Sequence, residues 1–76
     1  MNIPEITLDA IDLWVNHKLP TGGFLEAVIN NDLVGAISKA DPMNLVALPL
    51  IVTHINSISG VPKFYAGAMR EWVNDK

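Results

Sequence analysis

A chain of 76 residues makes one domain, residues 1–76, and folding at this size buries only about 60% of the surface that the unfolded chain exposes. There is no cysteine, the formal net charge is −3 and the five Lys and Arg residues are scattered, so disulfide bonds are excluded and nucleic-acid binding is not expected. Half of the residues are hydrophobic, only 17% are charged and the mean hydropathy is +0.30, which is a surplus of apolar surface for so small a core. We therefore expect a homo-oligomer.

The spacing of apolar residues predicts an all-α protein, a compact bundle of about five short helices. The first helix is expected to start at Thr7 as its N-cap and to place Ile11 and Trp14 on its inner face. It should end near His17, because Pro20 biases the residue before it away from helical geometry.

The segment Leu19–Gly23 predicts a turn, and a second helix is expected from about Gly23. Residues 30–32 interrupt that helix, and Asp32 is a suitable N-cap for a short third helix. The inner side of this third helix is expected to carry Leu33, Ala36 and Ile37.

Asp41 followed by Pro42 is a strong start signal for a fourth helix, since proline at the first helical position loses no hydrogen bond. The apolar period continues through Leu45, Leu48, Ile51, Ile55 and Ile58. Pro49 falls inside that period, and two interpretations are open: a helix kinked at Pro49, which the unbroken period favours, or a loop over 41–47 followed by a helix that starts at Pro49.

Residues 59–62 separate this element from a last helix with a broad apolar stripe. The stripe contains Phe64, Tyr65, Ala68, Met69, Trp72 and Val73. Phe64, Tyr65, Met69 and Trp72 are candidates for a protein interface, because aromatic residues dominate such sites, and plain core packing is the equal alternative.

The run Leu19–Val28 (LPTGGFLEAV) is followed by Asn31-Asp32-Leu33 and then by Ala40-Asp41 with Asn44. With these residues, the segment 14–55 resembles a family of short uncharacterised proteins of tailed phages and prophages. The resemblance implies a phage accessory protein in the cytoplasm of an infected bacterial host, and it implies no reaction. The fourth helix carries less charge than is usual in that family.

Thr21, Gly22, Gly23 and Phe24 are the candidate ligand-binding residues. Two glycines permit positive φ and close approach of a ligand, and unpaired N–H groups at the start of the second helix favour a small anion. The alternative is a tight helix–helix turn in which Thr21 acts as a cap. No lysine lies within the turn, unlike a phosphate-binding loop.

No catalytic residues, metal ligands or cofactor are expected. His54 and Ser57 are spaced as a base and a nucleophile, but no orienting acid accompanies them, and the two histidines lack metal-ligand spacing. No membrane association is expected either, because the longest apolar run, residues 45–52, is far shorter than the ~20 residues of a spanning helix.

The sequence therefore predicts a protein that is not an enzyme and acts by stoichiometric binding. The leading hypothesis is an interaction module that engages a host or phage protein. A second hypothesis is an oligomeric sponge for a small anionic ligand such as a nucleotide signal, with a role in counter-defence. The third is a structural part of the virion or of its assembly.

Overall fold

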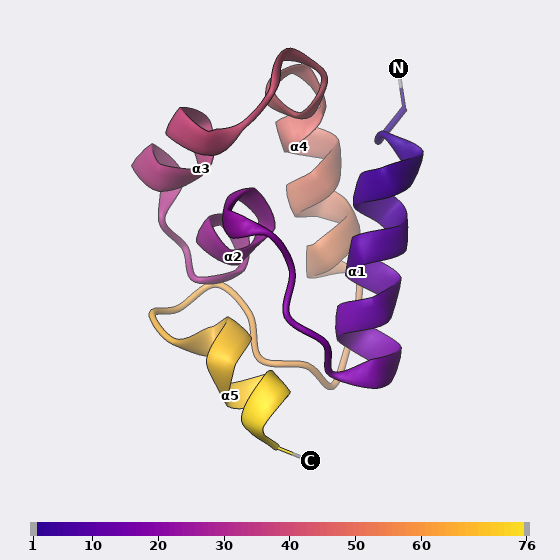
Figure 1. The fold of residues 1–76 in the computed structure, drawn as a ribbon, viewed down its shortest axis with the longest axis vertical. Coiled ribbons are helices and arrows are strands. Elements are labelled where there is room, and N and C mark those ends of the chain that lie inside the picture. The colour runs from indigo at the N-terminus through magenta and orange to yellow at the C-terminus, as the bar shows by residue number, and fades with distance from the viewer. Residues whose placement is uncertain (1, 76) are drawn as a thin grey trace.

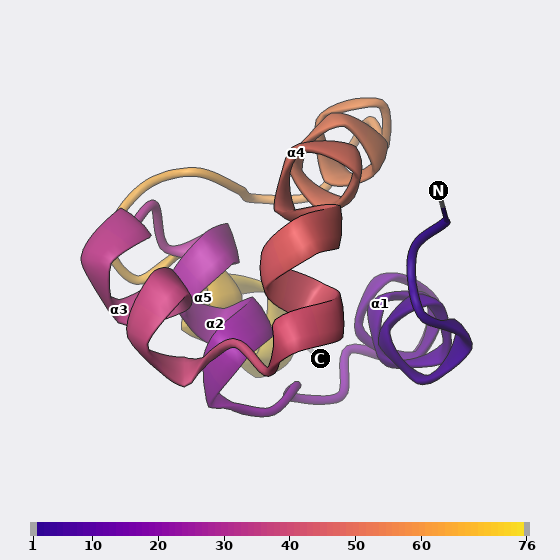
Figure 2. The same ribbon diagram turned by 90° about the horizontal axis from the view of Figure 1, so that it is seen from above.

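The computed structural model describes residues 2–75, which fold into five helices without a strand in that range (Figure 1). They are α1 (Glu5–His17), α2 (Gly23–Ile29), α3 (Leu33–Lys39), α4 (Pro42–Asn56) and α5 (Ala68–Asn74). The short helix α2 lies in the middle, between α3 on one side and α1 and α4 on the other (Figures 1 and 2). The predicted all-α class and the predicted number of short helices are confirmed.

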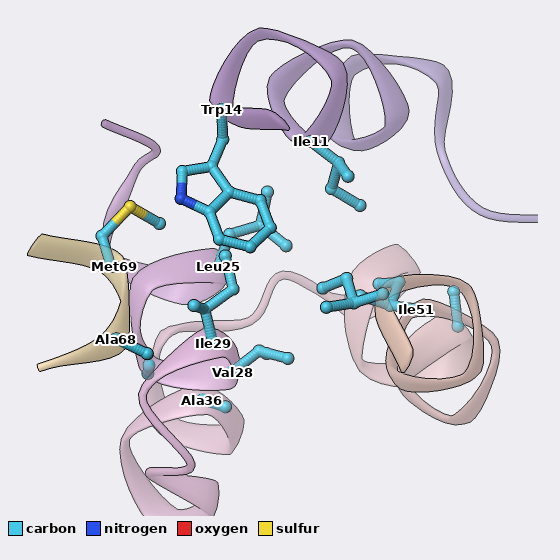
Figure 3. Close-up of a cluster of buried hydrophobic side chains, with 12 residues drawn as sticks. Ile11, Trp14, Leu25, Val28, Ile29, Ala36, Ile51, Ala68 and Met69 are labelled. Carbon is cyan, nitrogen blue, oxygen red and sulfur yellow. The ribbon is translucent and has the colours of Figure 1, made fainter. Parts of the chain in front are cut away.

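The core is built around Trp14, the largest side chain with no exposed surface. Figure 3 shows its indole ring between α1 and the central α2, above Leu25, with Met69 of α5 at its side. Four of the seven residues of α2 are buried, because other helices surround it. The buried apolar residues are Ile11, Trp14, Leu25, Ala27, Val28, Ile29, Ala36, Ala47, Ile51, Ile55, Ala68 and Met69.

The start of α1 differs from the prediction. Thr7 is not the N-cap: the helix follows Pro4, and Thr7 lies inside its first turns with only 6% of its surface exposed. Its hydroxyl donates a hydrogen bond of 2.7 Å to the Asn44 side-chain oxygen, which ties α1 to α4. Capping signals describe local structure, so they could not distinguish a cap from a buried hydroxyl with a partner 37 residues away.

The end of α1 is where the sequence places it, but Pro20 is not the direct cause. Lys18 adopts the left-handed conformation with φ of 55°, and the Leu19 N–H bonds back to the carbonyl of Leu13 at 3.3 Å. The Lys18 N–H also donates to the carbonyl of Trp14, four residues earlier, at 3.1 Å, which is the pattern of a helix that ends in a left-handed residue.

Asp32 caps α3 as predicted, because its carboxylate accepts a 3.0 Å hydrogen bond from the Gly35 N–H. A Cβ on Gly35 would lie 2.2 Å from the other carboxylate oxygen of Asp32. Glycine at this position therefore leaves room for the capping side chain. The predicted inner side of α3 is wrong for two residues, since only Ala36 is buried and both Leu33 and Ile37 are exposed.

Asp41 caps α4, which starts with Pro42 and continues without a break through Pro49. The alternative of a helix that begins at Pro49 is therefore wrong. Figures 1 and 2 show that the first turns of α4 and its remainder point in different directions. Pro49 lies on the exposed side, and the clash of its ring with the carbonyl four residues earlier bends the axis away from it, toward the core.

The last helix is shorter than predicted, because Phe64 and Tyr65 precede it and α5 begins only at Ala68. Phe64 and Gly67 have positive φ values of 65° and 85°, which no right-handed helix accommodates.

Within residues 2–75, no helix has both the length and the apolar character needed to cross a bilayer.

Asp41→Ala is expected to lower the free energy of unfolding by about 1 kcal/mol, because the Asn44 N–H loses its 2.8 Å partner at the start of α4. Asp41→Asn keeps an acceptor oxygen and should stay within a few tenths of a kcal/mol of wild type. Urea denaturation followed by circular dichroism measures both. An unchanged midpoint for Asp41→Ala would show that this cap does not stabilise the fold.

Candidate functional site

The turn predicted to bind a ligand connects α1 to α2 without unusual backbone geometry. Gly22 is the N-cap of α2 with φ of −70°, and neither Gly22 nor Gly23 has a positive φ. The expectation that these glycines supply positive φ is therefore wrong. The Thr21 hydroxyl donates to the carbonyl of Gly22 at 3.0 Å, so it is not the side-chain cap of α2. Phe24, in the first turn, is packed against the core rather than free.

A lysine from another element does reach this turn. A Cβ on Gly23 would lie 3.3 Å from Cδ and 3.8 Å from Nζ of Lys39, at the end of α3. The sequence could not show this proximity, because 16 positions separate the two residues. However, α2 has only seven residues, so its dipole is weak, and the binding of an anion at Thr21–Phe24 stays a prediction.

The residues considered for catalysis or metal binding are not assembled into a site. The Ser57 hydroxyl donates to the backbone carbonyl of His54 at 2.6 Å, which directs its proton to the backbone instead of the imidazole. Among residues 2–75, no three His, Asp or Glu side chains are grouped closely enough to hold a metal ion.

The four residues of the predicted C-terminal interface do not form one stripe. Met69 is only 1% exposed and belongs to the core, so it offers no surface to a partner. Tyr65 lies at the surface before α5 and donates a hydrogen bond to the Glu71 carboxylate. This bond raises the pKa of Tyr65 above its usual value, since deprotonation would lose the bond and place two negative charges side by side.

Trp72 holds the C-terminal helix against the end of α1. Its indole N–H donates a 2.8 Å hydrogen bond to the backbone carbonyl of Trp14. The Lys18 ammonium lies 4.4 Å from the centroid of the Trp72 ring and 3.6 Å from the Asp75 carboxylate. These contacts of Trp72 are all within its own chain, as expected if it packs in the core and does not form an interface.

A different apolar surface is exposed, and the sequence analysis did not identify it. Val34 is 76% exposed and Leu33 63%, although both are large apolar residues. Together with exposed residues of α4 they make a continuous surface, because helical spacing puts Leu45 and Val52 on the side of α4 that faces α3. We call it the α3–α4 face; it consists of Leu33, Val34, Ile37, Leu45 and Val52.

A groove of about 220 Å³ runs through this face between the two helices. Leu33 and Ala36 form its wall on α3, and Leu48 and Val52 form its wall on α4. Phe64 also lines the groove. It is the one residue of the predicted C-terminal interface that borders this exposed apolar surface.

Phe64 reaches the groove in a strained conformation. A bulky side chain with φ of 65° is an outlier, and such strain is concentrated at functional positions. The Phe64 N–H donates to the carbonyl of Ile29, the last residue of α2, which fixes the backbone in this state.

The α3–α4 face is almost free of charge. No Asp, Glu, Lys or Arg occurs from residue 42 to residue 62, so α4 contributes none. In α3 the only charged residue is Lys39, which lies beside Gly23 and away from the groove. The Asp32 carboxylate, which caps α3, is the only charged group among the residues that line the groove. This absence of charge was the signal in the sequence that could have located the surface.

Comparison with models of known protein families, with curated proteins and with solved structures gives no match for this chain. The candidate site therefore rests on its geometry and composition.

Gly23→Ala is expected to be neutral or to stabilise the protein by less than about 1 kcal/mol, because φ at Gly23 is negative and the flexible Lys39 side chain can shift. Gly22→Ala should instead destabilise by a few tenths of a kcal/mol to about 1 kcal/mol, since alanine is a poor N-cap. Thermal melts of the two variants test this contrast. Strong destabilisation by Gly23→Ala would contradict the geometry described for the turn.

Trp72→Phe is expected to lower the free energy of unfolding by about 1 kcal/mol, because it removes the hydrogen bond to the Trp14 carbonyl. Tyr65→Phe is the matched control: it also removes a donor, but an exposed one, and should change stability by less than about 0.5 kcal/mol. Urea denaturation and native mass spectrometry measure stability and subunit number. A changed subunit number at unchanged stability in Trp72→Phe would favour the C-terminal interface after all.

Proposed function

We propose that this protein acts by stoichiometric binding of another protein chain through the α3–α4 face, and not by turnover. The observation that carries the proposal is the exposure of five large apolar residues on the two helices that border a groove. Apolar patches of this kind on small proteins mark interaction sites. The exposed residues are not needed for the core, which is complete without them.

The size of the groove favours a protein partner over a small molecule. Sites for small molecules are usually concave and about 300–1,000 Å³ in volume. The groove is about 220 Å³ and lies open between two helices, so it suits one or two apolar side chains projecting from a partner. Helix-in-groove recognition uses anchors of this type.

The biological setting comes from the resemblance of residues 14–55 to short phage and prophage proteins. It supports an accessory role in the cytoplasm of an infected bacterial cell, with a host or phage protein as the partner. The sponge for a nucleotide signal and the virion component remain hypotheses from the sequence; for the sponge, the structure adds only that Lys39 lies beside Gly23.

The proposal predicts that a photo-crosslinking amino acid at Val34 captures a protein chain when the full-length protein is made in bacterial cells. Leu13 is the matched control, because it is also a large exposed apolar residue on a helix but lies on α1, across the molecule from α3. Denaturing gels and mass spectrometry give the yield and identity of the products. Equal yields at Val34 and Leu13 would contradict a binding role for the α3–α4 face.

A further inference from the structure

We propose that the partner that occupies the α3–α4 face is a second copy of this chain, in a two-fold symmetric dimer. This inference rests on the proposed function and names its partner. Three observations carry it: the area of the face, its lack of charge, and the presence of both a groove and protruding side chains on the same surface.

The area of the face suits a small dimer. The exposed fractions of its five residues add up to between two and three fully exposed large apolar side chains. This corresponds to on the order of 500 Å², which is within the range for the largest apolar patch of a typical monomer. Each partner in a stable complex buries about 800 Å², and the polar atoms around an apolar centre account for the rest of such an area.

The lack of charge favours an identical partner over a different one. The chain has a net charge of −3, so two copies repel each other unless they meet where that charge is absent. The α3–α4 face comes close to this condition: residues 42–62 contain no Asp, Glu, Lys or Arg, and the one carboxylate at the groove, that of Asp32, accepts a hydrogen bond from the Gly35 N–H. A complex between different proteins gains specificity and speed from complementary charges, which this face does not offer. Apolar, charge-poor interfaces are typical of homodimers.

The shape of the face is complementary to itself. In a two-fold dimer the same surface patch serves both subunits, so it must supply both the cavity and the groups that fill it. Leu33 and Val34 protrude from α3, and the groove lies directly beside Leu33. Apolar side chains of each copy can therefore enter the groove of the other, with Phe64 at its base.

The test is the subunit number of the purified full-length chain, measured by sedimentation velocity and native mass spectrometry from low to high micromolar concentration. Wild type is expected to be a dimer. Val34→Lys should raise the dissociation constant about a hundredfold or more, because it buries an unpaired ammonium group twice in each dimer. Leu13→Lys, which adds the same charge to an exposed apolar position on α1, should leave the dissociation constant within about threefold of wild type.

Circular dichroism should show equal helix content in all three proteins, because Val34 and Leu13 make no part of the buried core. Wild type that stays monomeric at high micromolar concentration would overturn the inference. A dimer that Val34→Lys and Leu13→Lys weaken equally would overturn it as well, since another surface would then join the copies.

The crosslinking experiment separates this inference from the proposed function. When isotopically light and heavy chains are purified from separate cultures and mixed before irradiation, a second copy gives crosslinked products of mixed light and heavy composition at Val34. Capture of a different protein at Val34 by a chain that is monomeric would overturn the second-copy inference and leave the binding function in place. Absence of any product specific to Val34 would overturn both.

Discussion

Burial of the Trp14 side chain is the interaction on which the rest of this fold depends. Helices of seven to fifteen residues are marginal in water on their own, so each must be held by tertiary packing. The indole of Trp14 lies where α1, α2 and α5 meet, and its backbone carbonyl accepts the hydrogen bond from Trp72 that docks the last helix. This central position has a cost: among residues 2–75 the buried Trp14 indole N–H has no hydrogen-bond partner, a loss of about 1–3 kcal/mol that apolar burial offsets.

A core centred on one tryptophan is small, and that limit determines the surface of the protein. Helices α1, α2 and α5 surround Trp14, whereas α3 contributes only Ala36 to the core and packs mainly against α2. The large side chains of α3 and the outer side of α4 are therefore left without partners. The proposed binding function would give these side chains a partner, which is how the small core and that proposal are connected.

The sequence allowed correct prediction wherever the determinants were local. Asp32 and Asp41 were identified as caps because a capping side chain contacts a backbone N–H only three residues away. The start of α1 and of α5 depends instead on distant partners: Thr7 bonds to Asn44, and the Phe64 backbone is fixed by Ile29. Such contacts leave no periodic signal in the sequence.

The same reasoning explains why the α3–α4 face was not identified from the sequence. Aromatic residues of the C-terminal segment attracted attention, but Met69 and Trp72 proved to be needed within the fold. The residues of α3 are apolar on nearly every side, so periodicity could not tell which of them point inward. The packing of α2 against one side of α3 decides which of these residues are buried.

Pro49 has a consequence for the chain before it folds. Residues 42–62 form the most apolar and least charged stretch of the protein, and such segments form intermolecular β-sheets readily when exposed. A proline in the middle of residues 45–52 interrupts that pairing, because it lacks the N–H that a sheet ladder requires. Asp41 and Lys63 flank the stretch with opposite charges in the manner of gatekeeper residues. The residue that bends α4 in the native state is therefore also expected to disfavour aggregation of the unfolded chain.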